Sequence, residues 1–318
     1  MKKILLFTLT LLSHFTIVAQ YSYYQDAAQA QLHDNPAAAG RDGSSQVRLS
    51  YNNTAANLLG SNSYQQGYLY YDNGIALKNN DIIGIGVGAS RDVAGESEFG
   101  VTSASLSAAY HRNLSSSSTH RQYLTLGTGL SLNRQTLDDS DLRWPGQIDP
   151  DKGFCPSIPS GEETPSALYL GVDLGLTYGI YWTDGQFATI GLAYQDLNRP
   201  NTSLFAEGEV LAPSTLIASA LARIQVAGRL FLEPNIRYAT LKEQSLLNIG
   251  NNFGYQLSDK SSVMVGFASH DNDRYAVNVG AELQGMRAML IYGWTAGEDS
   301  FAATAYELNL AYRIDSGR

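Results

Sequence analysis

Cysteine is almost missing from this 318-residue chain, which contains only Cys155. A single cysteine excludes an internal disulfide framework, so the fold has to be stabilised by its secondary structure and packing. Long hydrophobic runs are missing too. After residue 20, no stretch reaches the roughly 18 apolar residues that a membrane-spanning helix requires. If the protein lies in a membrane, it therefore does not cross it with helices.

Basic residues are also few, with 21 Lys and Arg against 30 Asp and Glu, and the net charge is −9. Nucleic-acid binding relies on Lys and Arg to neutralise phosphates, so this balance argues against a nucleic-acid partner. Charged residues make up only 16% of the chain, whereas it contains 30 Gly and 20 Tyr. This composition is unusual for a soluble enzyme, and the length allows either two ordinary domains or one large β-barrel.

Motifs for catalysis and cofactor binding are missing as well. The five histidines show no metal-binding spacing, and no Gly-x-Ser-x-Gly nucleophile elbow occurs. The segment GIGVGA at 84–89 formally matches a dinucleotide-binding fingerprint. That motif needs a helix directly after it, however, and this segment lies within a predicted strand. We therefore expect no enzymatic activity, no catalytic residues, no cofactor and no bound metal.

The first 19 residues have the features of a secretory signal peptide. Lys2 and Lys3 supply the positive start, and a mostly apolar stretch follows as far as Val18. The small residue Ala19 precedes the expected cleavage point at Gln20. We therefore expect the protein to be exported from the cytoplasm.

Alternation between two kinds of side chain is the main pattern in the rest of the chain. In residues 121–134, leucines at 124, 126, 130 and 132 alternate with small or polar residues such as Gly127 and Asn133. Successive side chains of a strand point to opposite faces, so this segment predicts a strand with one apolar and one polar face. No segment shows a convincing helical period. Fourteen segments are predicted to be strands: 45–53, 63–72, 81–91, 99–112, 121–134, 166–182, 186–195, 213–226, 230–240, 245–257, 262–270, 274–283, 287–295 and 302–314.

The predicted strands favour a transmembrane barrel over a soluble β-sandwich. Many of them are about 9–14 residues long, close to the length that a tilted strand needs to cross a bilayer. Lipid offers no hydrogen bonds to an open sheet edge, so the sheet must close on itself. The apolar face would then contact lipid, and the face carrying Asp173, Glu282 and Glu307 would line the lumen. Tyrosines near strand ends would lie at the membrane–water boundary: Tyr68, Tyr70, Tyr71, Tyr110, Tyr123, Tyr194, Tyr238, Tyr255 and Tyr292.

The sequence therefore predicts an all-β fold, an antiparallel transmembrane β-barrel of about 14 strands in the cell outer membrane. Residues 1–19 would be the signal peptide, residues 20–44 a lead-in or plug segment, and residues 45–314 the barrel. A barrel of this width leaves a lumen unless something fills it. Either the lead-in segment or the long loop at residues 135–165 could do so.

The loop at residues 135–165 is the main candidate for a functional surface, because structureless loops of this length are usually functional or disordered. It is rich in carboxylates, but the spacing of an EF-hand is absent, so solvated charge is favoured over a Ca²⁺ site. A tryptophan beside prolines suits contact with another protein. The residues predicted to bind a partner are Asp138, Asp139, Asp141 and Trp144 in this loop, and Asn35, Pro36 and Gly40 in the lead-in segment.

Five short motifs along the chain carry a resemblance to a known family. They are NPAAAG at 35–40, VRLSY at 47–51, IGIGVG at 83–88, LAPS at 211–214 and YELNLAYRI at 306–314. Together with a signal peptide that ends at glutamine, they resemble the PorP/SprF family, outer-membrane proteins of the type IX secretion system of Bacteroidetes. Two features depart from that family. Residues 28–33 replace its aromatic-rich stretch, and the chain continues after its last predicted strand.

The resemblance implies a barrel that helps to export partner proteins carrying a C-terminal secretion signal, or that holds them at the cell surface. Gliding adhesins are the known type of partner, so the resemblance also implies a link to gliding motility. Further implied partners are other type IX secretion components and the lipid of the outer membrane. An outer-membrane channel or transporter for small or hydrophobic solutes is the alternative that stays open. An outer-membrane hydrolase is disfavoured because no nucleophile motif is present.

Overall fold

The structure, a computed structural model, describes ten stretches of the chain. The predicted signal peptide lies outside them, as does most of the loop at residues 135–165. Within the described residues, no helix is both long and apolar enough to span a membrane. The described stretches are 30–54, 64–95, 98–138, 147–149, 153–155, 166–204, 208–241, 244–271, 273–296 and 304–314.

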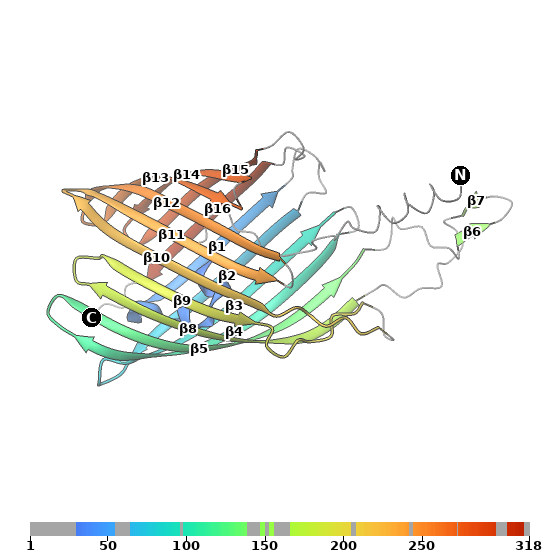
Figure 1. Ribbon diagram of the computed structural model, residues 1–318, viewed down its shortest axis with the longest axis horizontal. Coiled ribbons are helices and arrows are strands. Elements are labelled where there is room, and N and C mark those ends of the chain that lie inside the picture. Colours follow the sequence, from blue (N-terminus) through green and yellow to red (C-terminus); the bar gives the residue numbers. More distant parts are fainter. Residues whose placement is uncertain are drawn as a thin grey trace.

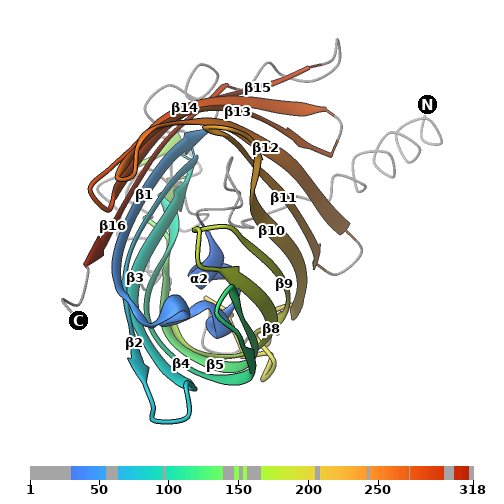
Figure 2. The same ribbon diagram turned by 90° about the vertical axis from the view of Figure 1, so that its left-hand side faces the viewer.

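The described chain forms a closed barrel of fourteen antiparallel strands (Figures 1 and 2). The first strand, β1 (Ser45–Thr54), closes the barrel by pairing with the last, β16 (Thr304–Ile314). The predicted barrel of about 14 strands is therefore confirmed. The other barrel strands are β2 (Tyr64–Ala76), β3 (Ile82–Ala94), β4 (Phe99–Ser116), β5 (His120–Thr136), β8 (Ser166–Trp182), β9 (Phe187–Gln195), β10 (Thr215–Ala227), β11 (Leu230–Leu241), β12 (Gln244–Ser258), β13 (Ser261–His270), β14 (Arg274–Leu283) and β15 (Met286–Thr295).

Side chains alternate along the strands as the sequence predicts. On β5, Leu126 is 64% exposed on the outer face, whereas Thr125 beside it is 3% exposed and faces the lumen. The same alternation places leucine, isoleucine and valine on the outside of every barrel strand, whereas most of the residues that face inward are small or polar. An apolar outer surface of this extent is unfavourable in water but favourable in lipid.

Three of the nine tyrosines predicted at the membrane boundary face the lumen instead, so that part of the prediction is wrong. Tyr68 and Tyr70 of β2 and Tyr123 of β5 are each at most 6% exposed. They occupy inward-facing positions of their strands. Successive side chains of a strand point to opposite faces, so a tyrosine at an inward-facing position points into the lumen even when it lies near the strand end. The other six lie on the outer face and are 39–44% exposed.

The two ends of the barrel differ in the length of their connections. At one end, here the short-turn end, only two to four residues separate β8 from β9, β10 from β11, β12 from β13, and β14 from β15. In the β14–β15 turn, Gln284 and Gly285 both have positive φ, as a two-residue hairpin of type I′ requires. At the other end, here the long-loop end, long connections follow β1, β5 and β9, whereas only two and three residues separate β11 from β12 and β13 from β14. Long connections on one side and tight turns on the other are typical of outer-membrane barrels.

A small hairpin lies within the loop at residues 135–165, where the sequence predicts irregular structure. It consists of β6 (Ile148–Asp149) and β7 (Gly153–Phe154). Cys155 follows it directly, and its backbone N donates a hydrogen bond of 2.8 Å to Gln147 O. The Cys155 side chain is half-buried and carries a free thiol.

Candidate functional site

Residues 30–44, here the plug, lie inside the barrel. The plug consists of the short helix α2 (Gln31–Asp34) and two 3₁₀ turns, η1 (Pro36–Ala38) and η2 (Arg41–Gly43). Figure 2 shows these elements within the ring of strands. The turn η1 packs against β3, β4, β5 and β8, and η2 packs against β2 and β3. Since β1 starts directly after the plug, the plug ends at the short-turn end of the lumen.

Asn35 shapes the plug locally by joining α2 to η1. Its backbone is extended, with φ −144°, and its Oδ1 accepts a hydrogen bond of 2.9 Å from Ala37 N. Pro36 follows at the first position of η1, where no amide hydrogen is needed. The Asn35 Nδ2 group donates to Leu192 O of the barrel wall at 3.3 Å. The Asn-Pro pair therefore both turns the chain and fixes it to β9.

Glycines in the wall allow the backbone of the plug to come unusually close to the strands. A Cβ atom at Gly84 of β3 would overlap Ala39 O, and a Cβ atom at Gly127 of β5 would overlap Ala37 N. No side chain fits at either wall position unless the plug moves. Gly84 and Gly127 are therefore required by the plug, in addition to forming part of the small-residue face that the sequence predicts.

Gly40→Ala is expected to loosen the plug and to destabilise the barrel. Gly40 has φ +62°, a backbone conformation that costs any other residue roughly 1–2 kcal/mol, and its Cβ would lie only 2.5 Å from Gly84 Cα. We expect the purified protein to unfold at a lower temperature, measured by the heat-dependent change in its electrophoretic mobility. Gly95→Ala is the matched control, because Gly95 has φ +74° and no described residue other than its chain neighbours comes within 4 Å of its Cβ position. Equal losses in the two variants would contradict close packing at Gly40.

An ion pair fastens the beginning of the plug to the opposite side of the lumen. Arg237 of β11 donates from Nε to Asp34 Oδ2 at 2.6 Å and from Nη2 to Asp34 Oδ1 at 2.9 Å. The two residues are only 7% and 4% exposed. Each charge has lost most of its water, so each depends on the other for compensation. The plug therefore reaches across the lumen from β2–β5 to β11.

His33 lies next to this ion pair and against two tyrosines of β2. Its Nδ1 is 2.8 Å from Tyr70 Oη, and its ring stacks on Tyr68 with 5.8 Å between the ring centroids. Burial lowers the pKa of His33 below its ordinary value of 6.5, the negative charge of Asp34 opposes this shift, and the positive charge of Arg237 adds to it. The docked plug therefore favours a neutral imidazole.

Acidification is expected to weaken the docking of the plug. An undocked plug would expose His33 to water and restore its pKa to about 6.5, so the undocked form binds a proton more readily than the docked form. Docking is therefore fully stable above about pH 6.5 and weakens as the pH falls toward the lowered pKa. Hydrogen exchange of the plug amides, corrected for intrinsic rates, measures this change. His33→Gln should remove the pH dependence, and its persistence in that variant would exclude His33 as the cause.

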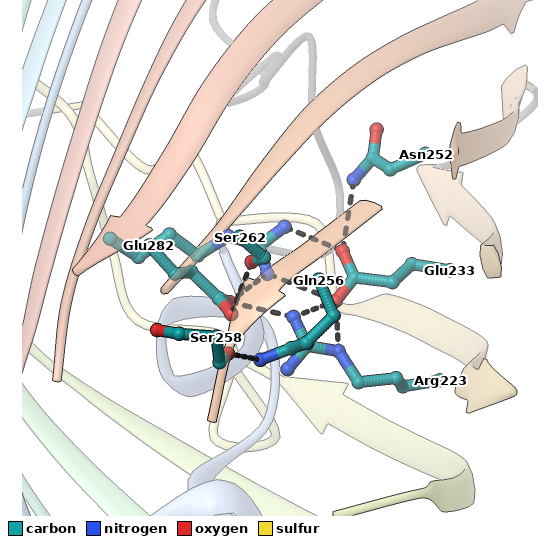
Figure 3. Close-up of polar contacts among 8 residues, drawn as sticks. Arg223, Glu233, Asn252, Gln256, Ser258, Ser262 and Glu282 are labelled. Carbon is teal, nitrogen blue, oxygen red and sulfur yellow. Dashed lines mark hydrogen bonds and ion pairs between the residues drawn. The ribbon is translucent and has the colours of Figure 1, made fainter. Parts of the chain in front are cut away.

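Four charged residues form an ionic cluster at the short-turn end, on the other side of the barrel from η1. Arg223 of β10 contacts both Glu233 of β11 and Glu282 of β14, each at 2.7 Å (Figure 3). Arg287 of β15 contacts the same two glutamates at 2.6 and 2.9 Å. The ionic cluster therefore has two positive and two negative charges and no net charge.

The ionic cluster bridges strands that are not neighbours in the sheet. Two strands, β12 and β13, lie between β11 and β14. They contribute hydrogen bonds from Asn252 Nδ2 to Glu233 Oε2 at 3.3 Å and from Ser262 Oγ to Glu282 Oε2 at 3.2 Å. The Arg223 guanidinium also lies 4.6 Å from the centre of the Phe231 ring. These contacts run across the inner surface of the wall, so side chains occupy the lumen along this arc of the barrel.

A cavity of about 420 Å³, here the vestibule, lies between the plug and the long-loop end. Leu32, His33 and Pro36 of the plug form its floor. Its walls include polar side chains of β3, β4, β5, β8 and β10, apolar side chains such as Phe99 and Val101, and part of the connection after β9. The plug therefore separates the vestibule from the short-turn end.

The structure brings together three of the seven residues predicted to bind a partner. Asn35, Pro36 and Gly40 all lie in the plug, and the contacts described above join them to the barrel wall. Asp138 is exposed, two residues after the end of β5. The remaining three, Asp139, Asp141 and Trp144, lie outside the described residues.

The sequence pattern places Glu282 on the lumen face but does not identify the other charged residues that organise the lumen, which are Asp34, Arg223, Glu233, Arg237 and Arg287. Glu233 and Arg237 both occupy inward-facing positions of β11. A charged residue on the small or polar face of a predicted strand is the signal that could have identified them. Their partners Arg287 and Asp34 are far away in the sequence, however, so the pairing itself left no local pattern.

No curated protein matches the chain. Among solved structures, it is similar to the CymD monoaromatic hydrocarbon channel, with 11% identity and a TM-score of 0.47 over 94% of this chain and 95% of that one. It is also similar to the P. putida toluene transporter TodX, with 14% identity and a TM-score of 0.45 over 92% and 94%. A third similar structure is CdiB from Acinetobacter baumannii, with 13% identity and a TM-score of 0.42 over 85% of this chain. The match spans only 60% of the length of CdiB.

A family model described as type IX secretion system membrane protein PorP/SprF matches residues 14–312. This is the family that the five sequence motifs resemble, so that prediction is confirmed. A membrane protein that is a closed antiparallel barrel with an apolar outer face lies in the outer membrane. The predicted localisation is therefore confirmed as well.

Proposed function

Because the chain belongs to the PorP/SprF family of type IX secretion system membrane proteins, we propose that it has a non-catalytic role in attaching exported proteins to the cell surface. The attached proteins would be those that carry a C-terminal secretion signal, and other components of the secretion system would deliver them. Of the two roles that the family resemblance implies, export and attachment, the arrangement of the lumen favours attachment.

The observation that carries this proposal is the obstruction of the lumen by the plug. A polypeptide that passed through the barrel would have to separate the buried Asp34–Arg237 pair and lift the plug backbone away from Gly84 and Gly127. Breaking a buried ion pair alone costs about 3–5 kcal/mol. The ionic cluster adds a second barrier at the short-turn end. The vestibule, in contrast, lies between the plug and the long-loop end and offers room to hold part of a partner.

Deletion of the gene in the native bacterium tests this proposal. Surface biotinylation and mass spectrometry of the cell and medium fractions would follow all exported proteins with a C-terminal secretion signal. For a role in attachment, we expect some of them to leave the surface fraction and to appear in the medium. Their accumulation in the periplasm would indicate a role in export instead. An unchanged surface proteome, together with rapid solute flux in liposome swelling, would favour the solute-channel alternative.

A further inference from the structure

Two buried residues of the vestibule carry hydroxyl groups that are available to a ligand. Ser107 of β4 and Thr215 of β10 line the cavity and are 8% and 4% exposed. Neither side chain makes a hydrogen bond to another described residue. Both hydroxyl oxygens are open to the cavity, so each can donate a hydrogen bond to, or accept one from, a molecule that enters it.

The vestibule is also negatively charged. Asp92, Asp173 and Asp196 line its wall, and Asp196 N donates a hydrogen bond of 3.0 Å to Asp173 Oδ1, which brings two of these carboxylates together. Arg237 is the only lysine or arginine among the described lining residues, and Asp34 neutralises it. Burial raises the pKa of Asp196, which means that its charge is poorly solvated. A cation in the vestibule would therefore be stabilised by the wall.

The remaining lining residues suit a peptide chain. Three neighbouring strands present serine hydroxyls, which can bond peptide N–H and C=O groups, at Ser90, Ser105 and Ser131. The aromatic rings of Phe99 and Tyr169 lie in the same wall. Such rings pack against the apolar stems of lysine and arginine and attract their charged ends.

We propose that the vestibule binds a basic, extended segment of the attached partner protein, inserted from the long-loop end. Its lysine or arginine side chains pair with Asp173 and Asp196, and its backbone bonds to Ser107 and Thr215. This inference rests on the proposed attachment function. An inorganic cation does not need a cavity of about 420 Å³, and a neutral saccharide does not need three carboxylates. A basic peptide accounts for the volume, the hydroxyls and the charge together.

Binding of short peptides to the purified mature barrel in detergent tests whether the vestibule prefers a basic segment. The probes are a fluorescent peptide of glycine, serine and lysine, and the same peptide with glutamate in place of lysine. We expect fluorescence anisotropy to show binding of the lysine peptide only, with an affinity that falls as salt is added. Asp173→Asn/Asp196→Asn should weaken it about tenfold, and Ser107→Ala/Thr215→Val should weaken it less. The control is Asp184→Asn, which neutralises an exposed carboxylate in the β8–β9 turn at the far end.

Three results would overturn the inference. They are equal binding of the two peptides, unchanged binding in Asp173→Asn/Asp196→Asn, and displacement of the lysine peptide by a neutral oligosaccharide. Surface proteomics of the same variant in cells separates this inference from the function on which it rests. If deletion releases surface proteins but Asp173→Asn/Asp196→Asn retains them, the vestibule assignment is wrong and attachment stands. If deletion itself releases none, the attachment function is wrong.

Discussion

Arg237→Met is expected to release the plug from β11 and to allow ions to pass through the lumen. The substitution leaves the Asp34 carboxylate, which is 4% exposed, without the guanidinium that donates two hydrogen bonds to it. The loss amounts to about 3–5 kcal/mol, because an uncompensated charge stays buried. Hydrogen exchange of the plug amides should become much faster, and single-channel current in planar bilayers should increase.

The double variant Asp34→Leu/Arg237→Met is the control for this prediction. It removes both charges, and apolar residues of similar volume often replace a buried ion pair without loss of stability. Slow exchange and low current should therefore return. If Arg237→Met alone exchanges and conducts like the native protein, the ion pair does not hold the plug in place.

Arg287→Met is expected to destabilise the half of the barrel that contains the ionic cluster. Arg287 lies 2.6 Å from Glu233 and 2.9 Å from Glu282, and Glu233 is only 3% exposed. Without Arg287, a single guanidinium, that of Arg223, has to compensate two carboxylates that are close together. Removing one partner of a buried pair costs about 3–5 kcal/mol, so the thermal transition of the purified barrel should move to a clearly lower temperature.

Arg229→Met serves as the matched arginine control. Arg229 is exposed in the β10–β11 turn, and within the described part of the chain its side chain donates only to Leu257 O, at 3.3 Å. We expect this variant to melt close to the native temperature, because exposed polar contacts contribute little. Adding Glu282→Gln to Arg287→Met should recover part of the loss. Equal destabilisation by the two arginine substitutions would show that the ionic cluster has no special role.

The positions of the strands were predictable because side-chain alternation is a local property of the chain. The bounds of β8 and β14 agree with the predicted segments 166–182 and 274–283. The prediction for β4 stopped too early, at residue 112, whereas the strand continues to Ser116. Its last residues pair with β5 through an irregularity in the register between Asn113 and Ser115. A serine-rich stretch resembles a loop by composition, and only the neighbouring strand makes it part of the sheet.

The internal arrangement of the lumen was not predictable from local patterns. The sequence marks Asn35 and Pro36 as part of a lead-in segment, and the structure shows that Asn35 Oδ1 accepts a hydrogen bond from Ala37 N within the plug. Nothing near Asp34 in the sequence, however, points to Arg237, which lies 203 positions away. The ionic cluster depends on the curvature that brings β11 and β14 together. Predicting the candidate site therefore requires knowledge of the closed barrel, whereas predicting a strand requires only the residues of that strand.

The seam between β1 and β16 joins the two ends of the barrel sequence, with Ser45 opposite Ile314. Bringing such distant segments together has a large loop-closure entropy and slows folding. The Asp34–Arg237 pair acts on the chain that leads into this seam, because it joins the plug, which ends where β1 begins, to β11, 203 positions further along the chain. The start of β1 is therefore held twice in the finished barrel, through the sheet by β2 and β16 and, through the plug, across the lumen by β11. The segment that obstructs the lumen is thus also an internal cross-link that secures the first strand at the seam.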